Sequence, residues 1–430
     1  MKYLLKVIIL FLIVFNFHVP AIHYSCTVAV IFCVLYGVMF KRASLFTYFA
    51  YRHCFTILFW TFLMVVINVV ISALHERFSI DVIKRFVVQG YMLCCLVFAL
   101  PFLIDKKAAA FKDAIAVICG AFALQGLIHL LGFFISPMGE FLFSLHSKAL
   151  QDAAFDTTRN IDRFRFYSLT GSPFFELPAA YGVACILFFR MQLMPGQKHL
   201  KGATAFLVMV LLILGIALSG RTGFIGLGLG VLLYVVFNWR NFSLMGRHIV
   251  RISGGLALLT VIFYTTLTPQ QKDDFTNQLL PFALEAYYEW EITGELATAS
   301  TDDLIKEHYY PLDTETILWG RGGNSDSGIG FRHTDAGYMN SVMFGGVFYV
   351  LLLAFYQYLY FRQPMRLSRR LQSREGKINF FCFFILFAHM FILEYKGNAL
   401  GTQHITEVLL LYIGFSFLIE QYALEDGEEE

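Results

Sequence analysis

Membrane-length apolar runs recur along this chain and limit its fold more than any other feature. A helix needs about 20 apolar residues to cross the hydrocarbon core of a bilayer. The composition argues against burial of all these runs in the core of one soluble protein, because 57% of the residues are hydrophobic and only 15% are charged. We therefore predict an all-α polytopic membrane protein of about twelve transmembrane helices. The runs lie near 4–20, 22–40, 55–74, 86–104, 114–136, 174–190, 203–218, 222–239, 249–267, 338–361, 378–394 and 404–420.

Lysine and arginine residues near the ends of these runs indicate the orientation, since positive charge favours the cytoplasmic side. The strongest basic cluster occupies 362–377. With that cluster inside, both termini are cytoplasmic, and the two long connections, 137–173 and 268–335, form structured periplasmic loops. The whole chain, 1–430, is then a single integral membrane domain.

The two long connections carry helix signals of their own. Thr-Pro-Gln-Gln at 268–271 places an N-cap hydroxyl before a proline at the first helical position. We expect that helix to be interrupted at Pro281 and further helices at 283–297 and about 302–309. In the first loop we expect a helix from 137 to about 154.

Acidic residues dominate the second loop, which holds 13 Asp and Glu residues against 4 Lys and Arg residues. Such a surface argues against nucleic acid as a partner. Paired aspartates at 273–274 and 302–303 have the chemistry of hard-cation ligands. Helix starts, where the dipole favours negative charge, explain both pairs more simply. We predict no metal site and no cofactor.

The first candidate stretch for chemistry is RNIDRFRFYSLTGSPFFE, which contains Arg159, Arg163 and Arg165 and ends at Glu176. Arginine on the outer side runs against the positive-inside bias and therefore indicates an anionic partner near the membrane. Pairing with Asp156 and Asp162 is the structural alternative.

The second stretch is SGRTG, where a short turn between two spans holds Arg221 at the hydrocarbon edge. The forked donors of a guanidinium suit a phosphate or pyrophosphate. A snorkelling arginine with a packing role is the alternative.

The third stretch is RHTDAGY, where the second loop re-enters the membrane. Arg332 can bind an anion there, and His333 or Asp335 can accept a proton. A helix cap by Thr334 or Asp335 is the alternative, and both roles can coexist. The aromatic residues of the second loop can stack on sugar rings or form the loop's own small core: Tyr287, Tyr288, Trp290, Tyr309, Tyr310 and Trp319.

Several of these stretches together resemble the O-antigen polymerase (Wzy-type) family of bacterial inner-membrane glycosyltransferases. The matching segments are SGRTGFIGL, the acidic loop ending in LWGRG, HTDAGYMNSVMFGG and LEYKGN. The related O-antigen ligases have a similar pattern. The resemblance implies a GT-C-like, metal-independent enzyme. Such an enzyme moves a growing glycan from undecaprenyl pyrophosphate onto the next lipid-linked repeat unit.

The resemblance also implies roles for individual positions. Arg165 and Arg221 match arginines that would bind pyrophosphate, and Lys396 matches a basic residue late in the penultimate span. His333 and Asp335 match the polar pair before the glycine-tyrosine helix start. We add Arg332 to the pyrophosphate-binding set. Weaker substrate-binding candidates are Arg159, Arg163, Glu176 (where asparagine is expected), Arg321 and Tyr338.

The partners implied are a lipid-linked donor and acceptor glycan, membrane lipid, a chain-length regulator and a flippase. The implied location is the bacterial inner membrane, with the active site facing the periplasm. An O-antigen ligase and a lipid-linked oligosaccharide flippase are the alternative functions. Two folded outer loops, and the lack of recognisable inverted halves in the sequence, weigh against a transporter.

Overall fold

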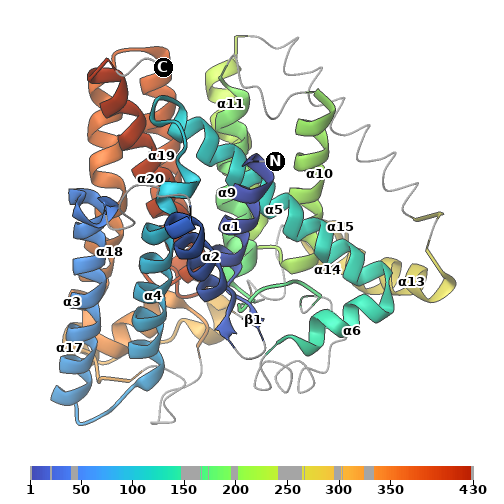
Figure 1. The fold of residues 1–430 in the computed structure, drawn as a ribbon. Coiled ribbons are helices and arrows are strands. Elements are labelled where there is room, and N and C mark those ends of the chain that lie inside the picture. Colours follow the sequence, from blue (N-terminus) through green and yellow to red (C-terminus); the bar gives the residue numbers. More distant parts are fainter. Residues whose placement is uncertain are drawn as a thin grey trace. The chain divides into compact units, whose positions relative to one another are not determined.

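Helices make up almost all of the regular structure in the computed structural model of this chain (Figure 1). The structure describes residues 2–19, 22–39, 47–146, 165, 167–172, 174–194, 202–240, 264–265, 267–294, 302, 304–323 and 334–427. Within these ranges, seven helical segments are long and apolar enough to cross a membrane. They are α3 (Arg52–Leu74), α4 (Ile80–Leu103), η2 with α5 (Lys107–Ala109 and Ala110–Phe134), α10 (Gly202–Ser219), α18 (Gly337–Arg370), α19 (Arg374–Lys396) and α20 (His404–Glu425). The chain is therefore an all-α membrane protein, as its composition predicts.

Shorter helices occupy most of the other predicted spans: α1 (Lys2–Phe15), α2 (Ser25–Met39), α9 (Glu176–Gln192) and α11 (Gly223–Asn238). A two-stranded antiparallel hairpin, β1 (His18–Val19) and β2 (His23–Tyr24), separates α1 from α2, and a single 3₁₀ turn, η1 (Thr47–Ala50), precedes α3. The predicted span at 249–267 falls almost wholly outside the described residues. The total of about twelve spans stays a prediction.

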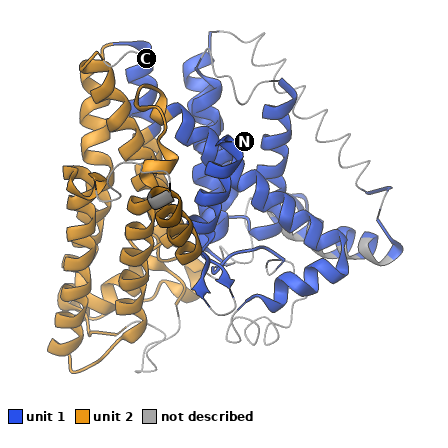
Figure 2. Ribbon diagram, in the orientation of Figure 1, with its two compact units in different colours: residues 1–25, 112–294, 373–382 blue, residues 26–111, 295–372, 383–430 orange. Residues whose placement is uncertain are grey.

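The chain divides into two compact units, coloured separately in Figure 2. Unit 1 comprises 1–25, 112–294 and 373–382. Its central helix is α9, whose residues from Leu177 to Met191 are all buried. Helix α11 packs on α9 through glycines: a Cβ atom at Gly226 would lie 2.2 Å from the Cα atom of Gly182. The two backbones therefore touch, as in small-residue packing between membrane helices.

Unit 2 comprises 26–111, 295–372 and 383–430, and α20 is its most deeply buried helix. A buried hydroxyl and amide network links three of its other helices. The Tyr356 hydroxyl on α18 lies 2.6 Å from the Thr61 hydroxyl of α3 and accepts a hydrogen bond from the Gln89 amide of α4 at 3.0 Å. Such hydrogen bonds satisfy polar groups that would otherwise be costly to bury.

The predicted loop helices form, with different bounds. The first loop begins with α6 (Ser136–Ser144), shorter than expected over the described residues. In the second loop the structure places α13 (Pro269–Asp274), η3 (a π-helix, Phe275–Leu279), α14 (Leu280–Ala283), α15 (Glu285–Thr293), η4 (a π-helix, Leu304–His308) and α17 (Thr314–Trp319). The proline at 269 starts a helix as predicted, whereas Pro281 does not interrupt one.

Helix α18 contains a kink that the sequence analysis did not predict. Gly345 and Gly346 leave helical geometry, and Gly346 has a φ of 72°. A Cβ atom at Gly346 would lie 2.1 Å from the carbonyl oxygen of Leu318 in α17. The Arg321 and Gly322 backbone N–H groups donate to the carbonyls just before the kink at 2.8 and 2.9 Å. The end of the second loop therefore packs on the kink, and the glycines at this contact allow the two backbones to approach closely.

Candidate functional site

The turn that carries Arg221 is short and tightly packed. Helix α10 ends at Ser219 and α11 begins at Gly223, so three residues join the two helices. The Gly220 N–H donates to the carbonyl of Ile216 at 2.8 Å. A Cβ atom at Gly223 would lie 2.7 Å from the carbonyl oxygen of Pro178 in the first turn of α9. The backbone beneath Arg221 is therefore held against a buried helix.

The Arg221 guanidinium forms an ion pair with the Glu285 carboxylate, which comes from the first turn of α15. Both side chains are largely buried, with exposed fractions of 19% and 21%. A guanidinium that holds a carboxylate in a partly desolvated position already performs anion recognition. The contact gives Arg221 a structural partner, and its predicted role in pyrophosphate binding stays a prediction.

Two predicted residues of the first stretch, Arg165 and Glu176, lie in the same unit. Arg165 is half-buried, and its carbonyl accepts a hydrogen bond from the Ser168 hydroxyl at 2.7 Å. The Ser168 carbonyl in turn lies 3.1 Å from Nε2 of His146. Glu176 is the first residue of α9, where the helix dipole favours its negative charge. That position gives Glu176 a structural explanation besides substrate binding.

In unit 2 the re-entry segment 334–340 is tied to the π-helical turn η4. The Thr334 hydroxyl donates to the carbonyl of His308 at 2.8 Å, and the Asp335 backbone N–H donates to Nδ1 of His308 at 2.9 Å. The Asn340 side chain donates to the Thr334 carbonyl at 3.0 Å. The cap residue of α18 is Ala336, and no side chain caps it. Neither Thr334 nor Asp335 is therefore the expected cap, and Asp335 is an exposed residue.

Polar and aromatic groups from α18 and α19 lie beside this segment. The Tyr338 hydroxyl donates to the Phe391 carbonyl at 3.1 Å. Glu394, with an exposed fraction of 1%, accepts from the Ser341 hydroxyl at 3.1 Å and the Leu400 N–H at 2.7 Å. Lys396 is the half-buried last residue of α19. Glu394 thus fixes the connection between α19 and α20.

Arg321 pairs with Asp313, a residue that also caps α17. The Asp313 carboxylate accepts from the backbone N–H of Thr316 at 2.8 Å and from its hydroxyl at 2.9 Å. These two hydrogen bonds, with Arg321 as a smaller contribution, lower the pKa of Asp313. The contacts give Arg321 a local structural role, and its predicted role in substrate binding stays a prediction.

The loop aromatics separate into two groups. Tyr309 and Tyr310 pack against a small cluster of Leu304 with Ala336 and Met339 at the start of α18, so they pack the second loop onto that helix. The Tyr309 ring also stacks on Tyr395, with ring centroids 4.9 Å apart. By contrast, three aromatics keep about half of their surface or more exposed: Tyr287 at 53%, Trp290 at 51% and Trp319 at 62%.

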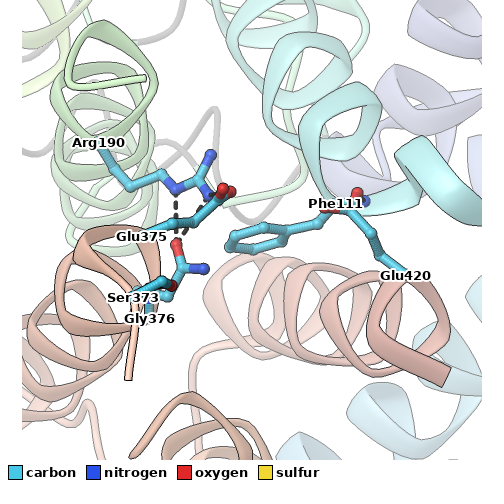
Figure 3. Close-up of polar contacts among 7 residues, drawn as sticks. Phe111, Arg190, Ser373, Glu375, Gly376 and Glu420 are labelled. Atoms are coloured by element: carbon cyan, nitrogen blue, oxygen red, sulfur yellow. Dashed lines mark hydrogen bonds and ion pairs between the residues drawn. The ribbon is translucent and has the colours of Figure 1, made fainter. Parts of the chain in front are cut away.

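Figure 3 shows two further polar contacts, each within its own unit. In unit 1, the fully buried Arg190 of α9 donates to the Asn379 amide oxygen at 3.0 and 2.7 Å and pairs with Glu375 at 3.3 Å. In unit 2, the backbone N–H of Phe111 donates to the Glu420 carboxylate at 2.8 Å. Both contacts tie helices together, and sequence reasoning had treated Arg190 only as an orientation signal.

Four predicted residues lie outside the described part of the chain: Arg159, Arg163, Arg332 and His333. Sequence reasoning missed residues that contact predicted ones, among them Glu285 and His308. No signal in the sequence singles out either of them, since each is one polar residue among many in an acidic loop. The described ranges contain no group of three or more His, Cys, Asp or Glu residues that could hold a metal ion.

No family model matches the chain, and no curated protein matches it either.

Proposed function

We propose that this protein polymerises lipid-linked oligosaccharide repeat units into a surface polysaccharide, transferring the growing chain from undecaprenyl pyrophosphate to the incoming unit. The observation that carries the proposal is the Arg221 ion pair. A guanidinium held by a glycine-packed turn between two apolar helices already binds an anionic group there. The resemblance of the surrounding SGRTG segment to O-antigen polymerases supplies the substrate class.

The chemistry of such a transfer needs a fixed positive charge. The acceptor hydroxyl oxygen forms a bond to the anomeric carbon of the donor glycan. The bond from that carbon to the phosphate oxygen breaks, and the pyrophosphate leaves with the electron pair. Negative charge therefore builds up on the leaving phosphate, and a preorganised guanidinium stabilises it without reorganising. We propose Arg221 for this task, with Arg165 of the same unit as a further phosphate ligand. The roles predicted for Arg332 and Lys396 in pyrophosphate binding stay predictions.

The acceptor hydroxyl must also lose its proton. Asp335 and His333 are the proposed catalytic residues for this step. The Asp335 carboxylate is exposed, and its backbone is fixed by the contact to His308. In this proposal the fold is GT-C-like with about twelve spans, both termini are cytoplasmic and the site faces the periplasm of a bacterial inner membrane.

Reconstitution tests the proposal. Purified protein is placed in vesicles with lipid-linked repeat units, and the products are separated by length. A ladder of polymers, lost in Arg221→Lys, is the expected result. A single transfer to a different acceptor would instead identify a ligase, and movement of the lipid across the bilayer without new glycosidic bonds would identify a flippase. Either of these results would refute the proposal.

A further inference from the structure

The His308 imidazole has a fixed orientation and a defined hydrogen-bonding state. Its Nδ1 atom lies 2.9 Å from the backbone nitrogen of Asp335, which carries the hydrogen of that bond. A nitrogen that accepts a hydrogen bond must offer a lone pair, so the neutral ring carries its proton on Nε2. A doubly protonated ring would place two N–H groups against each other and break the contact.

A second contact holds the same residue from its backbone. The Thr334 hydroxyl donates to the His308 carbonyl at 2.8 Å and accepts from the Ala336 N–H at 3.1 Å. Leu304 of η4 packs with Ala336 and Met339 in one small buried cluster. One apolar and two polar contacts therefore dock η4 on the start of α18. Only one of these three contacts uses the His308 side chain.

We infer that His308 is the positioning residue for Asp335. By accepting the Asp335 N–H through Nδ1, the imidazole fixes the backbone that carries the exposed carboxylate at the re-entry point. This inference rests on the proposed function, in which Asp335 is a proposed catalytic residue. It assigns His308 a role through Nδ1 as an acceptor and gives it no part in proton transfer.

Two substitutions distinguish the role of Nδ1 from that of Nε2. The amide oxygen of asparagine takes the place of Nδ1, whereas the end of a glutamine side chain takes the place of Nε2. His308→Asn keeps an acceptor for the Asp335 N–H, and His308→Gln removes it. Loss of one neutral hydrogen bond corresponds to a factor of about three to ten in an equilibrium. We therefore expect a fall in kcat of about three- to tenfold for His308→Gln and near-normal kcat for His308→Asn, with little change in the KM for the donor.

Amide hydrogen exchange at Asp335 gives a readout that needs no enzyme activity. Exchange of this amide should be faster by about three- to tenfold in His308→Gln and unchanged in His308→Asn. Thermal unfolding of both variants checks that the fold is kept. If His308→Gln keeps both normal exchange and normal kcat, the inference is wrong. It is also wrong if His308→Gln keeps kcat while His308→Asn loses it, since Nε2 would then be the active atom. Absence of polymer from the unaltered protein would refute the proposed function alone, and the exchange data would still decide the role of His308.

Discussion

The ion pair between Arg221 and Glu285 makes a quantitative prediction about donor binding. If a pyrophosphate takes the guanidinium, the Glu285 carboxylate must leave it first. A hydrogen bond to a charged group contributes about 1.5–3 kcal/mol. The burial of both side chains, with exposed fractions of 19% and 21%, protects the pair from solvent screening. Glutamine at 285 retains a neutral hydrogen bond of about 1 kcal/mol. The difference is about 0.5–2 kcal/mol, and the middle of this range corresponds to about tenfold in affinity.

We therefore expect Glu285→Gln to bind undecaprenyl pyrophosphate about tenfold more tightly than the unaltered protein. Equilibrium titration of purified protein in lipid nanodiscs measures this change, and the KM for the lipid-linked donor should fall in parallel. The matched control is Glu291→Gln, an equal change at an exposed position of the same helix. It should leave the affinity unchanged.

The reasoning would be refuted if Glu285→Gln bound the lipid pyrophosphate no better than Glu291→Gln. Equal affinity would mean that the carboxylate does not compete for Arg221. Weaker binding would mean that Glu285 supports the site instead of occupying it. Thermal unfolding of both variants separates these outcomes from loss of the fold.

Three further predictions concern packing, pH and proton transfer. Gly226→Leu should lower the free energy of unfolding by about 1–3 kcal/mol or more in detergent, because a side chain there meets the backbone of α9; Gly228→Leu, in open space, should not. Asp313→Ala should lower the free energy of unfolding by loss of the α17 cap. The folded-state pKa of Asp313 is lowered, so the stability that its ionised carboxylate contributes is present above the ordinary pKa of 3.8. This stability is lost as pH falls through the lower folded-state pKa. Unfolding curves of the protein and the variant should therefore converge in acid. His333→Ala should reduce turnover by about 10²–10⁴ if His333 is the base, with Asp335→Asn milder; the reverse order in single-turnover assays would assign the base role to Asp335.

The positions of the helices could be predicted from the sequence because apolar length is a local property. Most of the predicted spans coincide with helices, and a proline with its preceding threonine correctly marked the start of α13 at Pro269. The kink in α18 was missed for a physical reason. A glycine pair in an apolar run shows only that a kink is possible. What induces it at Gly346 is the close approach of Leu318, a contact with a separate helix.

The candidate site was only partly predictable, because its pairings join distant parts of the chain. The SGRTG turn indicated that Arg221 would be held in place, and the structure agrees. Its partner Glu285 is 64 residues away, and Asp335 meets His308 across 27 residues. Each partner is an ordinary polar residue of an acidic loop. Only the fold determines which one reaches the arginine or the re-entry segment.

The central claim is that Arg221 holds the pyrophosphate of a lipid-linked glycan, and a binding comparison tests it most directly. Native mass spectrometry of the protein and of Arg221→Lys is carried out with undecaprenyl pyrophosphate and with undecaprenol, which has no phosphate. We predict at least about tenfold weaker binding of the pyrophosphate by Arg221→Lys, since lysine lacks the two-pronged donor geometry. Binding of undecaprenol should be equal for the two proteins. Equal binding of the pyrophosphate by both proteins would contradict the claim.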